Sequence, residues 1–82
     1  MAYLIDIRKT GEDERSVQYY FEGDGFDIAR GSGLISIDKL SGDVDVLEHA
    51  GKDWERLCDK VVGKLGRFWK SGQFPDCTDY AA

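Results

Sequence analysis

DWERLCDKVVGKLGRFWK, residues 53–70, is the one long amphipathic stretch in this sequence. Its large apolar side chains recur with the 3.6-residue period of an α-helix through about four turns, and they fill an arc of roughly 140° around the helix axis. These side chains are Trp54, Leu57, Cys58, Val61, Val62, Leu65, Phe68 and Trp69. The pattern predicts a helix at about residues 52–71, with an apolar side that covers a sheet built from the preceding residues.

Three glycines mark the end and the interior of this predicted helix. Gly72 stands where a left-handed residue commonly ends a helix. Gly63 and Gly66 lie inside it, where each costs roughly 1 kcal/mol relative to alanine. Gly63 points away from the apolar arc, so close packing in the core does not account for it. Two interpretations stay open: a partner approaches the helix backbone there, or a well-packed helix tolerates the weakness.

Four stretches before the helix are typical of strands. Residues 3–8 and 16–22 alternate apolar and polar side chains. Residues 34–39 and 43–48 predict a hairpin around the loop 39–42, in which Gly42 occupies a left-handed position. The glycine-containing segments 23–25 and 31–33 are expected to interrupt the chain between strands. Residues 26–30 fit either a bulged continuation or a short strand of their own.

The order of these elements predicts an α+β fold. The sheet is a four-stranded antiparallel meander (β-β-β-β-α), and one C-terminal amphipathic helix packs on one face of it. All 82 residues form a single small domain, which ends in an irregular tail at residues 72–82 because of Pro75. The strand side chains expected to meet the helix are Ile5, Ile7, Val17, Tyr19, Phe21, Ile35, Ile37, Val44 and Val46.

The charges are unevenly distributed along the chain. The formal net charge is −5; residues 1–51 carry a net −6 and residues 52–71 a net +3. This acidic balance argues against nucleic acid as a general partner, because such binding needs many phosphate contacts from Lys and Arg. No apolar run reaches membrane-spanning length and no signal-peptide pattern opens the chain. We therefore expect a cytoplasmic protein with no membrane partner, which suits its two unpaired-looking cysteines.

The sequence offers little catalytic or metal-binding chemistry. His49 is the single histidine, and no nucleophile stands at a recognised spacing from it. The two glycine segments lack the lysine and the following helix of a phosphate-binding loop. The acids of the hairpin, Asp38, Asp43 and Asp45, do not follow the spacing of a calcium loop. We therefore expect no enzymatic activity, no cofactor and no metal site.

One surface does suggest a role. Strand alternation places Leu4, Tyr20, Leu34 and Leu47 on the face of the sheet that points away from the helix. Exposed apolar groups of this kind often mark interaction sites. The candidate interaction surface consists of these four residues and the hairpin acids Asp38, Asp43 and Asp45. The competing interpretation is that Phe74 and Tyr80 of the tail fold back over the same face.

These observations favour a non-enzymatic protein–protein interaction module of the inhibitor, immunity or adaptor type. It would bind another protein, or form a weak homodimer, through the open sheet face or the acidic hairpin. Protein inhibitors of nucleases often share the small size and acidic charge of this chain, since they oppose basic active sites. The alternative is a small ligand-binding protein or enzyme with a pocket between sheet and helix, near Tyr19, His49 and Trp69. A structural role within an assembly is a third possibility.

Overall fold

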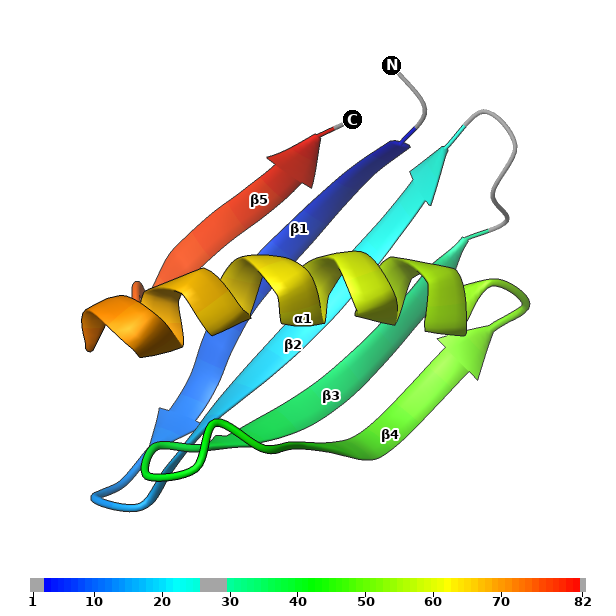
Figure 1. The fold of residues 1–82 in the computed structure, drawn as a ribbon. Helices are drawn as coiled ribbons and strands as arrows, with labels where there is room; N and C mark the ends of the chain where they lie inside the picture. Colours follow the sequence, from blue (N-terminus) through cyan, green and yellow to red (C-terminus); the bar gives the residue numbers. More distant parts are fainter. Residues whose placement is uncertain (1–2, 26–29, 82) are drawn as a thin grey trace.

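The structure is a computed structural model that describes residues 3–25 and 30–81. It confirms the α+β architecture, with one antiparallel sheet and one helix (Figure 1). The elements are β1 (Tyr3–Glu12), β2 (Ser16–Gly25), β3 (Gly31–Asp38), β4 (Val44–Gly51), α1 (Trp54–Ser71) and β5 (Cys77–Ala81). Neighbouring strands in the sheet follow the order β4-β3-β2-β1-β5. The question of a separate strand at residues 26–30 concerns mainly residues 26–29, which lie outside the described part of the chain.

The fifth strand, β5, shows that the predictions of a four-stranded sheet and an irregular tail were wrong. β5 pairs antiparallel with β1, so that Tyr80 stands opposite Ile5 and Thr78 opposite Ile7. The main-chain N–H of Lys9 donates to the carbonyl oxygen of Asp76 at 2.8 Å and aligns the start of this pairing. Local sequence does not indicate the strand because its partner lies some seventy positions earlier in the chain. Pro75 only precedes β5 and does not prevent it.

The glycine segments are also not the interruptions that the sequence suggested. Residues 23–25 complete β2, and residues 31–33 begin β3. Glycine occupies position 33 within the strand because a Cβ there would stand 2.5 Å from Cε2 of the Phe21 ring. The absent side chain makes room for an aromatic ring on the neighbouring strand. Glycine therefore serves packing at this position rather than chain reversal.

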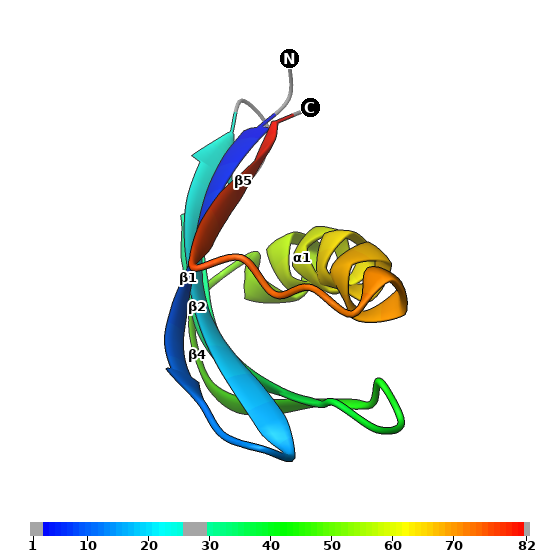
Figure 2. The same cartoon turned by 90° about the vertical axis from the view of Figure 1, so that its left-hand side faces the viewer.

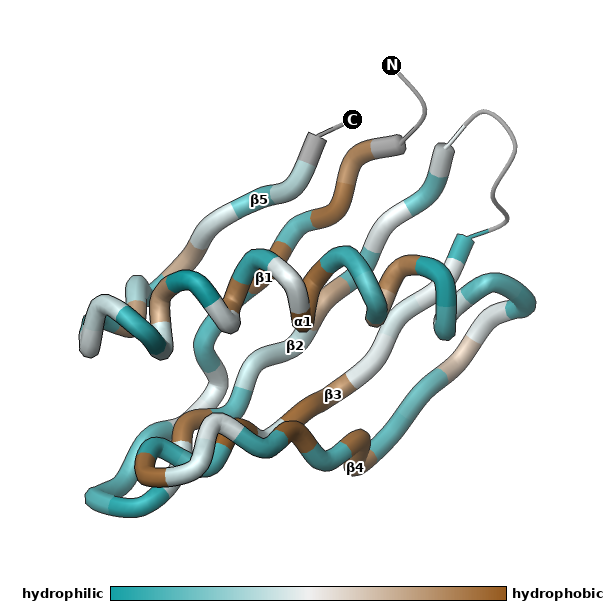
Figure 3. The backbone as a smooth tube through the Cα atoms, viewed as in Figure 1, coloured by the Kyte–Doolittle hydropathy of each residue, from teal (hydrophilic) through white to brown (hydrophobic). Residues whose placement is uncertain are grey.

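The sheet curves around the helix, which lies across its concave side (Figure 2). Hydrophobic positions recur along α1 and along the strands beneath it (Figure 3). The packing explains this pattern, since the two layers exclude water only where their apolar sides meet. The buried core consists of Ile5, Ile7, Val17, Tyr19, Phe21, Ile35 and Ile37 from the sheet and Leu57, Cys58, Val61 and Leu65 from the helix.

Two of the expected core positions lie at the margin of the core. Val44 is half-buried and packs against the core, whereas Val46 is 41% exposed. Both belong to β4, an edge strand of the sheet. The prediction that Val46 is in the core was wrong, because an edge strand has a neighbouring strand on one side only and Val46 stays open to water there.

The hairpin between β3 and β4 matches the prediction and contacts the helix. Ile37 pairs with Val44 and Ile35 with Val46, and Gly42 has the left-handed φ of 80°. This conformation places the loop under the indole of Trp69, whose Nε1–H donates to the Lys39 carbonyl oxygen at 2.9 Å. The helix ends as expected, with Gly72 at a φ of 76°.

Candidate functional site

The face of the sheet opposite the helix, here called the outer face, is uncovered in the part of the chain that the structure describes (Figure 2). Tyr20 and Leu34 alternate with the buried residues of β2 and β3 and stand directly opposite each other in the pairing. Phe74 and Tyr80 instead pack against the buried core on the helix side. The interpretation that the tail covers the outer face is therefore wrong.

Three of the four apolar residues gather around one shallow hollow on this face. Tyr20, Leu34 and Leu47 line it, and we call it the outer hollow; its volume is about 440 Å³. Ser32, Glu48 and Ala50 are among the residues that complete its wall. Leu47 reaches it because the pairing of β3 and β4 shifts by one residue between Leu34 and Ile35, which leaves Leu47 as the extra residue of β4.

Leu4 lies elsewhere on the outer face. It stands opposite Asp24, whereas Arg8 of the same strand stands opposite Tyr20. The separation of four positions between Leu4 and Arg8 corresponds to roughly 13 Å along β1. The structure therefore brings together Tyr20, Leu34 and Leu47 and leaves Leu4 apart, although Leu4 and Leu47 are almost equally exposed, at 49% and 48%.

Acidic side chains surround the apolar centre of the outer face. Arg8 lies on the same face, and Arg30 pairs with Glu22 at 2.8 Å. The acids outnumber the bases among the described residues of this face, so its potential is negative. The acids that strand alternation and register place there are Asp6, Glu22, Asp24, Asp45, Glu48 and Asp79.

The hairpin acids divide into two kinds. The carboxylate of Asp38 accepts main-chain N–H bonds from Leu40 at 2.8 Å and Ser41 at 3.0 Å. The bonds from Ser41 and Leu40 lower the pKa of Asp38, and its side chain builds the turn. Asp43 and Asp45 are exposed and lie beyond that turn. Of the three predicted acids, Asp43 and Asp45 are thus the ones that present their charge to solvent without building the turn.

The residues proposed for a pocket between sheet and helix are engaged in the fold. Tyr19 is completely buried, and its hydroxyl donates to the Pro75 carbonyl oxygen at 2.7 Å. Burial raises the pKa of Tyr19 to about 12. The ring of His49 stacks on the indole of Trp54 with 4.0 Å between centroids. Tyr19 and His49 are thus held by contacts within the fold.

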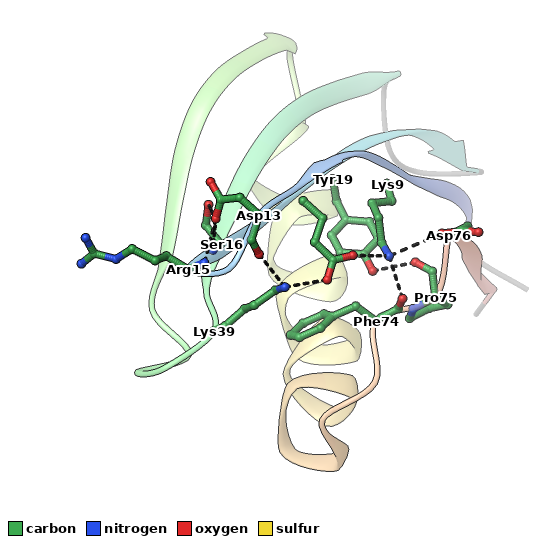
Figure 4. A network of polar contacts seen from close by, with 10 residues as sticks. Lys9, Asp13, Arg15, Ser16, Tyr19, Lys39, Phe74, Pro75 and Asp76 are labelled. Carbon is green, nitrogen blue, oxygen red and sulfur yellow. Dashed lines mark hydrogen bonds and ion pairs between the residues drawn. The ribbon is translucent and has the colours of Figure 1, made fainter.

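A polar cluster that sequence reasoning missed anchors the tail to the sheet (Figure 4). The ammonium of Lys9 donates to Glu12 at 2.7 Å and to the Phe74 carbonyl oxygen at 2.9 Å. Glu12 also accepts a bond from Lys39 at 2.6 Å. The cluster joins the end of β1, the β3–β4 loop and the segment that precedes β5. No local sequence pattern predicts this cluster, because its members come from three distant parts of the chain.

The polar cluster predicts a specific loss of stability in acid. The bonds from Lys39 and Lys9 lower the pKa of Glu12 below its usual value near 4.3. A lowered folded-state pKa means that this stabilisation is present above the unfolded pKa and is lost as the pH falls through the folded one. We expect Glu12→Gln to be less stable than the wild type near neutral pH, and this difference to disappear only once the pH falls below the lowered folded-state pKa of Glu12.

Urea unfolding at a series of pH values measures this difference. Glu14→Gln is the matched control, because it removes an equal charge from an exposed position of the same turn. A gap between wild type and Glu12→Gln that stays constant down to about pH 2 would contradict the role given to the carboxylate.

The fold and site define a small α+β domain with an open acidic sheet face. Comparison with known protein families, characterised proteins and solved structures found no match for this chain. Among residues 3–25 and 30–81, no three His, Cys, Asp or Glu side chains are grouped so that they could hold a metal ion. The described helix is not apolar enough to cross a membrane.

Proposed function

We propose that this protein is a non-enzymatic interaction module whose outer face binds a basic surface of another protein. The observation that carries the proposal is the outer hollow, where Tyr20, Leu34 and Leu47 converge on a face that no described element covers. Burial of one such side chain in an interface contributes on the order of 1.5–3 kcal/mol before the costs of association. The apolar centre thus supplies affinity.

The acids around this centre determine the kind of partner. Like charges that meet across an interface are destabilising, whereas a basic partner would be attracted and oriented. Glu48 lines the hollow itself and Glu22 lies next to Tyr20, whose hydroxyl donates to it at 3.3 Å. The same charges oppose a symmetric dimer through this face. The proposal therefore favours a basic protein over a second copy of the chain.

The exposed thiol of Cys77 supports the cytoplasm as the location. Cys58 is buried and Cys77 is exposed, and neither forms a disulfide. A reducing compartment keeps such thiols free. On this basis we propose that the protein acts in the cytoplasm. The proposed module is an inhibitor, an immunity protein or an adaptor.

Two matched variants test the proposed face. Leu47→Lys places a positive charge in the outer hollow, and Leu4→Lys places the same charge on the same face but outside the hollow. The two leucines are equally exposed, so both variants should fold. Wild type and both variants are used to capture proteins from a lysate of cells that produce the protein, and bound proteins are identified by mass spectrometry.

The expected result is one protein retained by wild type and Leu4→Lys and lost with Leu47→Lys. Once purified, that protein should bind Leu47→Lys about tenfold more weakly or worse, and its affinity for the wild type should fall as salt is added. Equal binding to both variants would remove the outer hollow from consideration.

Self-association through the outer face has its own signature in sedimentation. The acids repel their symmetric copies, so a homodimer would strengthen as salt screens them. We expect a monomer at low and high ionic strength. If the fraction of dimer rises with salt and the dimer is absent in Leu47→Lys, the partner of the outer face is a second copy of the chain and not a basic protein.

A further inference from the structure

A second hollow lies on the helix, on the opposite side of the molecule from the outer hollow. Its volume is about 340 Å³, and the two hollows share no lining residue. We call it the helix hollow. It is lined by Asp59, Lys60, Gly63, Lys64 and Arg67 of α1 and by Tyr80 of β5.

Three cations converge on the helix hollow although the protein as a whole is acidic. Lys60, Lys64 and Arg67 are spaced four and three residues apart, so they follow one face of the helix at intervals of about one turn, or roughly 5 Å. Asp59, at one end, is the single acid of the lining. The positive charge of the helix is therefore concentrated where the surface is concave, which raises the local attraction for anions.

Gly63 is one of the residues that line the helix hollow. A Cβ at this position would meet no atom within 4 Å, so no close packing requires a glycine there. Glycine inside a helix is destabilising relative to alanine. The missing side chain leaves room beside Lys60, Lys64 and Arg67 and lets a ligand approach the helix backbone.

The cations differ in what they can offer a ligand. The ammonium of Lys64 donates to the main-chain oxygen of Asp79, which holds it at the junction of α1 and β5. A lysine ammonium has three donors, so this bond leaves two for a ligand. Arg67 is exposed, and its planar guanidinium can donate two parallel bonds to a phosphate or a carboxylate.

We propose that the helix hollow binds a small multivalent anion, such as a phosphate-bearing ligand. Its negative groups lie on Lys60, Lys64 and Arg67, and its body lies over Gly63. A volume of about 340 Å³ falls at the lower end of small-molecule sites, which favours a small ligand over a peptide. This inference does not depend on the outer face, and each can fail alone.

Titration calorimetry with inorganic tripolyphosphate at low ionic strength tests the charge. Citrate serves as a second probe with carboxylate groups, and acetate at equal ionic strength as a monovalent control. We expect saturable one-to-one binding that Arg67→Gln weakens about tenfold. Lys70→Gln removes the same charge from the same helix outside the hollow, and it should change the affinity by less than about twofold.

A pair of glycine variants tests the shape of the hollow. Gly63→Ala and Gly66→Ala both add a methyl group that meets no atom within 4 Å, and both should raise the unfolding midpoint. Gly63→Ala adds a methyl group to the lining of the hollow and should weaken tripolyphosphate binding, whereas Gly66 does not line the hollow and Gly66→Ala should leave binding unchanged.

A gain in stability together with a loss of binding, at Gly63 alone, distinguishes a binding role for this glycine from a tolerated weakness in the helix. The proposal is overturned if neither tripolyphosphate nor citrate binds. It is also overturned if Lys70→Gln and Gly66→Ala weaken binding as much as Arg67→Gln and Gly63→Ala.

Discussion

Ending the chain after Gln73 is expected to lower the free energy of unfolding by about 4 kcal/mol or more. The truncation removes the half-buried rings of Phe74 and Tyr80 from the core. It also deprives the buried hydroxyl of Tyr19 of its acceptor, the carbonyl oxygen of Pro75. A stable small domain has only about 5–15 kcal/mol in total, so the truncated chain should unfold at much lower urea concentration.

Two proline variants separate the pairing of β5 from the mere presence of its side chains. Lys9 N–H donates to Asp76, and bonded pairs alternate in an antiparallel ladder, so the N–H of Thr78 points toward β1 and that of Asp79 toward the open edge. Thr78→Pro should therefore destabilise the protein more than Asp79→Pro. Equal losses in the two variants, or a truncated chain as stable as the wild type, would mean that β5 contributes little.

The second large effect concerns Phe21 and the glycine that faces it. Phe21 is completely buried, and Phe21→Ala should cost about 3–5 kcal/mol through lost burial and the cavity left behind. Gly33→Ala should cost about 1–3 kcal/mol for the opposite reason, because its new methyl group would stand 2.5 Å from the Phe21 ring.

The double variant tests whether these two effects share one cause. Once the ring is gone, the methyl at position 33 no longer meets it, although the Glu48 carbonyl oxygen remains at 3.2 Å. The free energy of unfolding that the double variant loses should thus be about 1 kcal/mol smaller than the sum of the losses in the two single variants, as measured by urea unfolding. Strict additivity would show that the ring and Gly33 do not compete for the same space. Gly66→Ala provides the control, since it should stabilise the chain in both backgrounds.

The helix and the inner side of the sheet could be predicted because their signals are local and periodic. The 3.6-residue period of residues 53–70 identifies α1, and strand alternation identifies seven of the buried sheet residues. The register of the β3–β4 hairpin follows from its loop length and from Gly42. In each case neighbouring residues carry the information, because one helix turn or one hairpin contains both partners.

The candidate site was partly accessible to the same reasoning. Alternation assigned Tyr20, Leu34 and Leu47 to the outer face, and the structure places them around one hollow. It could not show that Leu4 lies apart, since that depends on the pairing of β1 with β2. Nor could it show that Asp38 builds the turn while Asp43 and Asp45 face outward, because all three acids look alike in the sequence.

The sequence by itself determined the α+β class, the helix, the core side of the strands and the acidic balance of the surface. Only the tertiary structure decided that the tail forms β5, that Gly33 makes room for Phe21, and that Lys60, Gly63, Lys64 and Arg67 line one hollow together with Tyr80. The physical reason is the distance along the chain between the groups involved. Periodicity records which side of an element is apolar, whereas strand neighbours, close approaches and hollows arise between elements that only the folded chain brings together.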